Sequence, residues 1–419
     1  MNTKYSVIAC SALVLAAGTL VVAGPLSPVA GPVASTYKTL NEVEPRIAIS
    51  SANTPGDANS VYRISNPGSY YLTGNVVGQI GKDAVILIAA DNVTLDLGGY
   101  TIVCTETPPQ SVAQYGVNSG VVKGATVRNG KIAFAGTSHI AMSNSVGTRI
   151  EGIYGFSASE GAISVGAGAT VVDCTVIQAG SQGINAEQGS VIRNCTVQGT
   201  GDNGITVTRG VIDGCSVTGA GAYGFSLGEG STVTSSTASG CNYGFGAVSK
   251  SRFVNCVATG STNNGIVAGF GGVVEGSTAN NNGVDGILAN DDAVVRNCTA
   301  SDNTGHGINA DNRAVIIGNS ANKNGAANAG TTSGGIYVAG TDCRVEGNSV
   351  MGNDWGIRVN AAGSFIVRNT ASSNTTTNYT TVTNNFWGPV VSAAASAANS
   401  GNSGFGGLGN TDPNANFSY

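Results

Sequence analysis

One position, usually filled by Cys, Ser or Asn, recurs about every 21 residues over most of this 419-residue chain. The apolar runs around it are only a few residues long and rich in Val, Ile and Thr, which is typical of strands and too short for helices. Gly and Asn between the runs supply left-handed turn conformations. So regular a repeat predicts a solenoid, in which each unit packs on its neighbours. The position runs, in steps of 23, 21, 21, 20, 21, 20, 21, 21, 21, 29 and 21 residues, through Gly130, Ile153, Cys174, Cys195, Cys215, Ser236, Cys256, Ser277, Cys298, Asn319, Asn348 and Asn369.

This period and these short strands predict an all-β fold, a parallel β-helix solenoid of about 12 coils over residues 84–371. Leucine-rich repeats share the period, but their Leu-x-x-Leu-x-Leu frame is missing. Because solenoid ends expose strand edges, we expect an N-terminal cap at residues 35–83 and a C-terminal cap at 372–390. Residues 391–419 are expected to form a flexible Ser/Ala/Gly/Asn tail. The pattern leaves open whether its end, with Phe417 and Tyr419, docks on the body.

Residues 1–34 have the pattern of a signal peptide followed by a Pro/Ala-rich segment. A short start with one positive charge precedes the apolar run 7–23, which Gly24 and Pro25 end. The protein is therefore expected to be secreted, periplasmic or on the cell surface, with no membrane span in the mature chain. An uncleaved membrane anchor is the alternative.

The charge and the cysteines limit the partners and the crosslinks. A net charge of −5 argues against a nucleic-acid partner. We also expect the protein to be a monomer. The recurring position is expected to point inward as a ladder, so Cys174, Cys195 and Cys215 on adjacent coils could form disulfides. Free buried thiols are the favoured interpretation. The states of Cys104, Cys241 and Cys343 stay open. Lateral ion pairs are expected between Arg193 and Asp213, and between Glu275 and Arg296.

A second line of residues precedes the glycine, or its equivalent, at the start of each repeat. Nearly every member of this line can form a hydrogen bond or stack on a ring. Successive members would lie about 4.8 Å apart, the strand spacing. Such a line suits an extended sugar chain. The line consists of Tyr115, His139, Glu160, Gln182, Asn203, Tyr223, Tyr243, Asn264, Asp285, His306, Gly334 and Trp355. The candidate substrate-binding residues are Tyr223, Tyr243, Asn264, Trp355, His139, Gln182 and Asn203. The alternative is that these are ordinary exposed turn positions.

Asp285 and His306 stand on adjacent coils, so they form a candidate acid/base pair. A longer segment around residues 322–333 follows them, and long loops commonly carry function. Arg313 is a third candidate catalytic residue. Bound calcium is a possibility, because calcium prefers carboxylate oxygens and three carboxylates, those of Asp291, Asp292 and Asp311, are near in sequence.

The phrase NVTLDLGGYTI (92–102) and the repeated Gly-Ile or Gly-Phe turns resemble the pectate-lyase-like superfamily over residues 84–371. VYRISNPGSYYLTGNV (61–76) and the ending NANFSY look like those of secreted bacterial β-helix proteins of unassigned function. The resemblance implies a right-handed β-helix. It also implies one of several roles, since the group includes polysaccharide lyases, glycoside hydrolases, uronate epimerases and non-catalytic surface proteins. The Tyr-Gly-Phe segments 223–225 and 243–245 resemble the opening of the epimerase motif, but its acid and His are absent.

Three hypotheses follow. The favoured one is a secreted, non-catalytic β-helix whose polar and aromatic line contacts an extracellular polysaccharide or a cell-surface glycan. The second is a polysaccharide-degrading enzyme, a lyase before a hydrolase, centred on His306 and Asp285. The third is a purely structural surface protein.

Overall fold

The computed structural model describes residues 45–79, 81–104, 113–325, 333–392 and 412–419. The unit Arg46–Tyr419 holds every strand. The expected signal peptide at residues 1–34 lies outside the described residues. Among the described residues, no helix is both long and apolar enough to cross a membrane.

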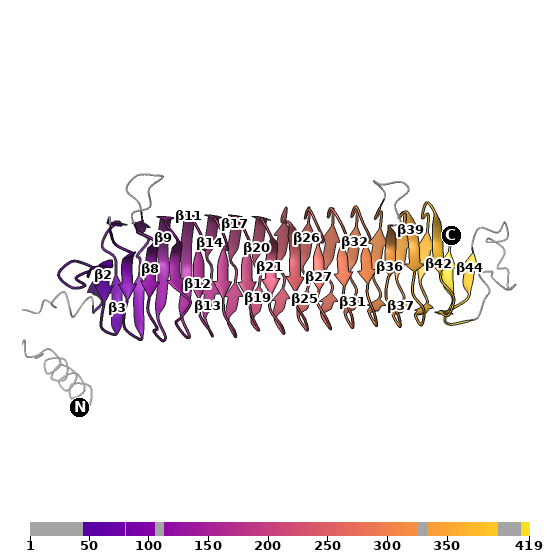
Figure 1. The fold of residues 1–419 in the computed structure, drawn as a ribbon, viewed down its shortest axis with the longest axis horizontal. Coiled ribbons are helices and arrows are strands. Elements are labelled where there is room, and N and C mark those ends of the chain that lie inside the picture. Colours follow the sequence, from indigo (N-terminus) through magenta and orange to yellow (C-terminus); the bar gives the residue numbers. More distant parts are fainter. Residues whose placement is uncertain (1–44, 80, 105–112, 326–332, 393–411) are drawn as a thin grey trace, which may run out of the picture. The chain divides into compact units, whose positions relative to one another are not determined.

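Most coils consist of three short strands, which pair with their equivalents on the next coil; in two coils a single ten-residue strand, β9 (Thr126–Ala135) or β11 (Arg149–Ala158), runs along two sides. One coil contains β15 (Ile184–Ala186), β16 (Val191–Arg193) and β17 (Thr196–Thr200). These pair in parallel with β18 (Ile205–Val207), β19 (Val211–Asp213) and β20 (Ser216–Ala220). The stack of such coils is seen in Figure 1. The predicted all-β parallel β-helix is confirmed.

One side of every coil contributes to a 15-stranded parallel sheet, and the other two sides form a 30-stranded sheet. The 15-stranded sheet contains β2 (Ser60–Ile64), β5 (Ala84–Ile88), β8 (Tyr115–Ser119), β10 (Ser138–Met142), β12 (Ile163–Val165), β15, β18, β21 (Tyr223–Leu227), β24 (Tyr243–Ala247), β27 (Ile266–Ala268), β30 (Ile287–Ala289), β33 (Ile308–Ala310), β36 (Gly334–Val338), β39 (Trp355–Val359) and β42 (Thr377–Thr381).

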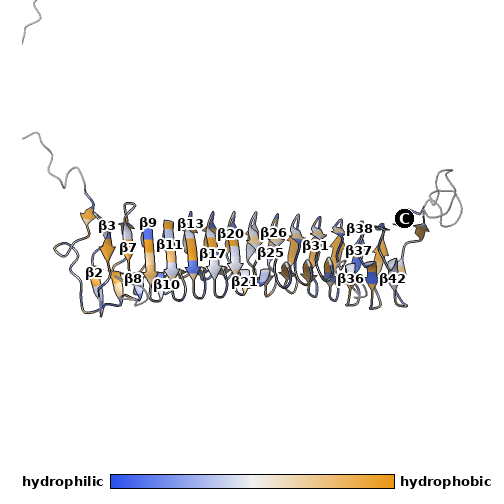
Figure 2. Cartoon of the chain, turned by 90° about the horizontal axis from the view of Figure 1, so that it is seen from above, coloured by the Kyte–Doolittle hydropathy of each residue, from blue (hydrophilic) through white to orange (hydrophobic). Residues whose placement is uncertain are grey.

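The helix therefore has 15 coils and not about 12. The additional coils come from the segments that were expected to act as caps. Ile64 and Tyr70 point into the core at 0% and 3% exposure, and β3 (Gly68–Tyr71) pairs in parallel with β6 (Val93–Asp96). At the other end, β42 pairs with β39. Hydrophobic segments recur on the strands along the stack (Figure 2).

The recurring position forms an inward ladder, as predicted. Cys174, Cys298 and Asn319 are at most 2% exposed. The residue before each ladder position turns the corner in the left-handed region, for example Asn297 at a φ of 54°. At the C-terminal end the ladder side chains are hydrogen-bonded to each other: Asn319 Nδ2 donates to Asn348 Oδ1 at 3.0 Å. The eight described cysteines are free and buried, which agrees with the favoured interpretation.

Two further inward ladders were missed from the sequence, and they account for two unassigned cysteines. Cys241 begins the ladder Cys241, Ser261, Asn282, Asn303, Asn324, Asn353 and Asn374, in which the amide oxygens accept from main-chain and side-chain N–H groups of the preceding coil. Cys343 belongs to a third, in which its N–H donates to Ser364 Oγ at 3.2 Å. The recurrence of Asn in the ladder that begins at Cys241 was the available signal for that ladder.

The end of the chain returns to the stack. The strand β45 (Asn416–Ser418) pairs in parallel with β41 (Thr370–Ser372) and β44 (Val390–Ser392). Asn416 continues the first ladder, because its Oδ1 accepts from Asn369 N at 3.0 Å. Residues 416–418 are thus ordered on the body, whereas most of the expected flexible tail, residues 393–411, lies outside the described residues.

The two predicted ion pairs have different outcomes. Glu275 and Arg296 form theirs, with Nη2 and Oε2 2.9 Å apart. Arg193 and Asp213 face each other in register, but the carboxylate of Asp213 accepts a hydrogen bond from Thr234 Oγ1 at 2.5 Å.

Candidate functional site

The predicted line of polar and aromatic residues lies on the outer face of the 15-stranded sheet. We call it the first outer row. The strand register places in it Tyr115, Ser138, Gly161, Gln182, Asn203, Tyr223, Tyr243, Asn264, Asp285, His306, Gly334, Trp355 and Thr377. Most of these residues are followed by a glycine, at a position that faces the core. A Cβ on Gly183, for example, would lie 2.4 Å from Val197 Cγ1, which leaves no room for a side chain there.

His139 is not in the first outer row, and its prediction as a substrate-binding residue is corrected here. It occupies the inward glycine position of its coil and is 0% exposed. The ring fits because Gly155 on the opposite strand lacks a side chain: a Cβ there would lie 2.5 Å from His139 Nδ1. His139 Nε2 donates to Phe156 O at 3.1 Å. Burial lowers its pKa to about 4, so the ring is neutral.

The predicted acid/base pair is adjacent but differently connected. Asp285 is 5% exposed, and its Oδ1 accepts from the main-chain N of His306 at 2.8 Å, not from the ring. Its Oδ2 accepts from Asn309 Nδ2 at 2.9 Å. Both carboxylate oxygens thus hold the main chain and a neighbouring amide, which is a structural use. Asn203 and Asn264 behave alike, since each accepts the main-chain N–H of the next coil's row residue.

His306 keeps one ring nitrogen available. Its Nδ1 accepts from Gly334 N at 2.8 Å, so the neutral ring carries its proton on Nε2. Burial lowers the pKa of His306; the nearby Asp285 opposes this shift and Arg358 adds to it. At neutral pH the side chain is therefore a hydrogen-bond donor.

Arg313 and the three carboxylates lie in the turns that follow two adjacent strands of the 15-stranded sheet. Asp291 and Asp292 follow β30, and Asp311 and Arg313 follow β33. Arg313 Nε and Nη2 bind the carboxylate of Asp292 at 2.6 and 2.8 Å. Burial, and then the charge of Asp291, raise the pKa of Asp311. Within the described part of the chain no three His, Cys, Asp or Glu side chains are close enough together to hold a metal ion. The speculative calcium site at Asp291, Asp292 and Asp311 is therefore not assembled.

Aromatic side chains gather at two places on this face. Tyr223 and Tyr243 stack with centroids 4.8 Å apart and an interplanar angle of 22°. Further along, the ring of His306 stacks on Tyr337 at 4.3 Å and 8°. The guanidinium of Arg358 lies 4.9 Å from the Trp355 ring centroid and 5.7 Å from that of Tyr337.

Sequence reasoning missed Tyr337 and Arg358. Each is the fourth of five residues of its strand and points outward, in a second outer row that runs beside the first. The signal was the period-2 alternation around the inward Ile and Val of each strand.

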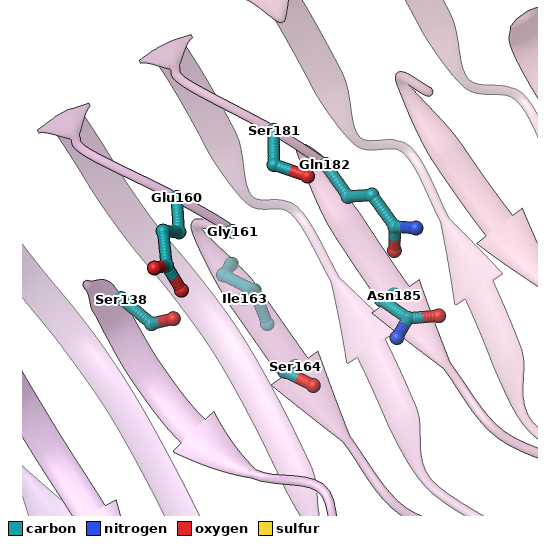
Figure 3. Close-up of a pocket in the computed structure, with 8 residues that line it drawn as sticks. All are labelled: Ser138, Glu160, Gly161, Ile163, Ser164, Ser181, Gln182 and Asn185. Atoms are coloured by element: carbon teal, nitrogen blue, oxygen red, sulfur yellow. The ribbon is translucent and has the colours of Figure 1, made fainter. Parts of the chain in front are cut away.

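A polar pocket of about 260 Å³ opens near the N-terminal part of the same face. It is lined by Ser138, Glu160, Gly161, Ile163, Ser164, Ser181, Gln182 and Asn185. Figure 3 shows the carboxylate of Glu160 beside Ser138, with the amides of Gln182 and Asn185 across the pocket. Glu160 lies in the turn just before the row position of Gly161 and is exposed.

Comparisons with known proteins identify the fold. The family model described as the right-handed β-helix region matches residues 63–211 and 208–350. No curated protein sequence matches the chain. Similar solved structures include the A-modules of two mannuronan C-5 epimerases of Azotobacter vinelandii. AlgE4 is 15% identical with a TM-score of 0.48, over 76% of this chain and 90% of that one. AlgE6 is 14% identical with a TM-score of 0.44, over 84% and 91%.

A third is the catalytic unit of the GH87 α-1,3-glucanase of Streptomyces thermodiastaticus, 11% identical with a TM-score of 0.31, over 84% of this chain and 61% of that one. All three identities are below 25% and all three TM-scores below 0.5, so the identification of the fold rests on the family model.

Proposed function

Because the chain belongs to the right-handed β-helix family, we propose that it is an exported, non-catalytic protein whose 15-stranded sheet binds an extracellular polysaccharide on its outer face. One observation carries the proposal: the stacked tyrosines, the His306–Tyr337–Trp355–Arg358 group and the polar pocket all lie along this one face. Aromatic rings offer apolar surface to the C–H faces of sugars, and amides and hydroxyls bond to sugar hydroxyls.

The spacing of these features favours an extended ligand. Tyr243 and His306 are separated by three strand-to-strand steps, or roughly 14 Å. A polymer lying along the coil axis would contact both aromatic groups. The use of both Asp285 oxygens within the protein favours binding over acid/base catalysis.

The test is binding of the full chain to a panel of neutral and acidic polysaccharides, with polymer size followed in the same samples. Replacing Trp355 by Ala is expected to weaken binding about 2- to 12-fold, the effect of losing one aromatic contact of about 0.5–1.5 kcal/mol. Phe365→Ala is the matched control, because the ring of Phe365 also lies beneath an arginine but belongs to the 30-stranded sheet. It should bind as the unmodified protein does.

Two results would contradict the proposal. Equal binding by the Trp355→Ala variant and the unmodified protein would remove this face from the interaction. Shortened polymer that a His306→Ala variant no longer produces would instead establish the enzyme hypothesis, since a binding protein leaves polymer length unchanged.

A further inference from the structure

We infer that the pocket around Glu160 is a subsite for a single sugar unit bearing a protonated amine. This inference rests on the proposed function, since it assigns a ligand class to one part of the same face.

Six polar side chains point into or border this pocket without bonding to the protein. They are Ser138, Glu160, Ser164, Ser181, Gln182 and Asn185. Among the described residues none of these six side chains forms a hydrogen bond or ion pair with another protein group. This differs from Asn203, Asn264 and Asp285 in the same row, whose oxygens accept main-chain N–H groups. Turn chemistry therefore accounts for those residues but not for the pocket.

The shape of the pocket comes from small residues in the first outer row. Ser138 and Gly161 stand where other coils carry Tyr, Asn or Gln. A Cβ on Gly161 would have only ordinary contacts, the nearest at 3.7 Å, so the missing side chain leaves open space and is not required by the backbone. A volume of about 260 Å³ is below the roughly 300–1,000 Å³ of sites for larger ligands, which suits one ring.

The charge of the lining selects the ligand. Among the eight described residues that line the pocket, Glu160 is the one charged residue, and none is Lys or Arg. A carboxylate accepts hydrogen bonds and forms its strongest ones with cationic donors, whereas a second carboxylate opposite it is repelled. The three serines and two amides both donate and accept, as sugar hydroxyls require. An amino sugar is therefore favoured over its N-acetylated form, and a uronate is disfavoured.

The test compares two ligands with the same backbone, the β-1,4-linked tetramers of glucosamine and of N-acetylglucosamine, titrated into the full chain at a pH where the amine is protonated. The glucosamine tetramer is expected to bind about tenfold more tightly. Glu160→Gln should bring this ratio close to one with little change for the N-acetylated tetramer. Glu187→Gln is the matched control, since Glu187 is also exposed in a turn but lies outside the pocket, and it should keep the ratio.

The outcomes separate this inference from the proposed function. If Glu160→Gln keeps the full ratio, or if neither tetramer binds while another polysaccharide binds through Trp355, the amine subsite is overturned and the binding face remains. If no glycan of the panel binds at all, both are overturned. A Gly161→Leu variant, which fills the pocket, should lower affinity for the glucosamine tetramer; unchanged affinity would place its contact elsewhere.

Discussion

At the scale of single residues, His139 and Gly155 exchange the sizes found in other coils. In several other coils the position of His139 is a glycine that faces a larger apolar residue across the core, as Gly183 faces Val197 and Gly116 faces Ile132. In their coil the histidine fills the glycine position, and Gly155 gives it room. The exchange keeps the core filled but buries an imidazole whose Nδ1 has no hydrogen-bond partner, which disfavours its protonated form.

This buried histidine should make the fold sensitive to moderate acid. Its pKa falls from 6.5 to about 4 on folding, so the unfolded chain binds the proton first. Stability is therefore complete above about pH 6.5 and is lost as pH falls toward 4, by about 3 kcal/mol. The His139→Gly/Gly155→Val double variant, which copies the Gly183–Val197 pair of another coil, should lose about that much less stability between pH 7 and 4. Denaturant unfolding at a series of pH values measures this. If the free energy of unfolding fell equally with pH in both proteins, the prediction would be contradicted.

At the scale of the strand and its corner, each ladder joins one coil to the next through side chains as well as through the sheet. Asn348 is 1% exposed. Its Oδ1 accepts from both N and Nδ2 of Asn319, at 2.8 and 3.0 Å, while its Nδ2 donates to Ile316 O and Asn369 Oδ1. In a buried corner every one of these partners loses its bond if the amide is removed.

Replacing Asn348 by Leu, of similar size, should therefore lower the free energy of unfolding by about 3–5 kcal/mol, since several buried polar groups lose their partners at about 1–3 kcal/mol each. Asn348→Ser should cost less, because Ser occupies this position in other coils and bonds the corner N–H there, as Ser277 does. The unfolding midpoint in urea is the readout. A Leu variant as stable as the Ser variant would show that the amide ladder contributes little.

The first ladder was predicted from the sequence, because a side chain inside a regular stack has the same surroundings on every coil. The other two ladders were missed, although their positions recur with the same period. The outer face was harder to predict. The first row was traced through the residue before each glycine. This rule gives His139 instead of Ser138, and Glu160 instead of Gly161, in two adjacent coils where His139 and Ala162 replace the glycine. Tyr337, Arg358 and the Glu160 pocket depend on which residues of a coil face outward and on the small size of Gly161, and neither follows from spacing alone.

At the scale of the whole stack, each coil contacts its neighbours, so stability is a sum of local interfaces and the ends are its weakest part. At the C-terminal end, Asn416 closes the first ladder: it accepts from Asn369 and its Nδ2 donates to Ile366 O and Gly388 O at 3.1 and 3.0 Å. Asn416 lies on β45, the last strand of the described chain, and this strand pairs with β41 and β44.

Asn416→Ala should consequently loosen only that end. We expect amide hydrogen exchange to become faster in β41 and in β40 (Phe365–Val367), because Asn369 N and Nδ2 lose their acceptor, while β15 to β17 exchange as before. Faster exchange over the full length would indicate one cooperative unit and not a chain of neighbouring interfaces.

The ladders inside the stack are uniform from coil to coil, whereas the rows on its outer face vary. This difference affects how the protein can evolve. Duplication or loss of one repeat in the gene would leave the interior with the same kind of neighbours, so selection against it would be weak there. On the outer face, gain or loss of a repeat between the tyrosines and Trp355 would change the distance between them by one strand spacing. The length of the ligand-facing surface can thus evolve in whole coils, independently of the core that supports it.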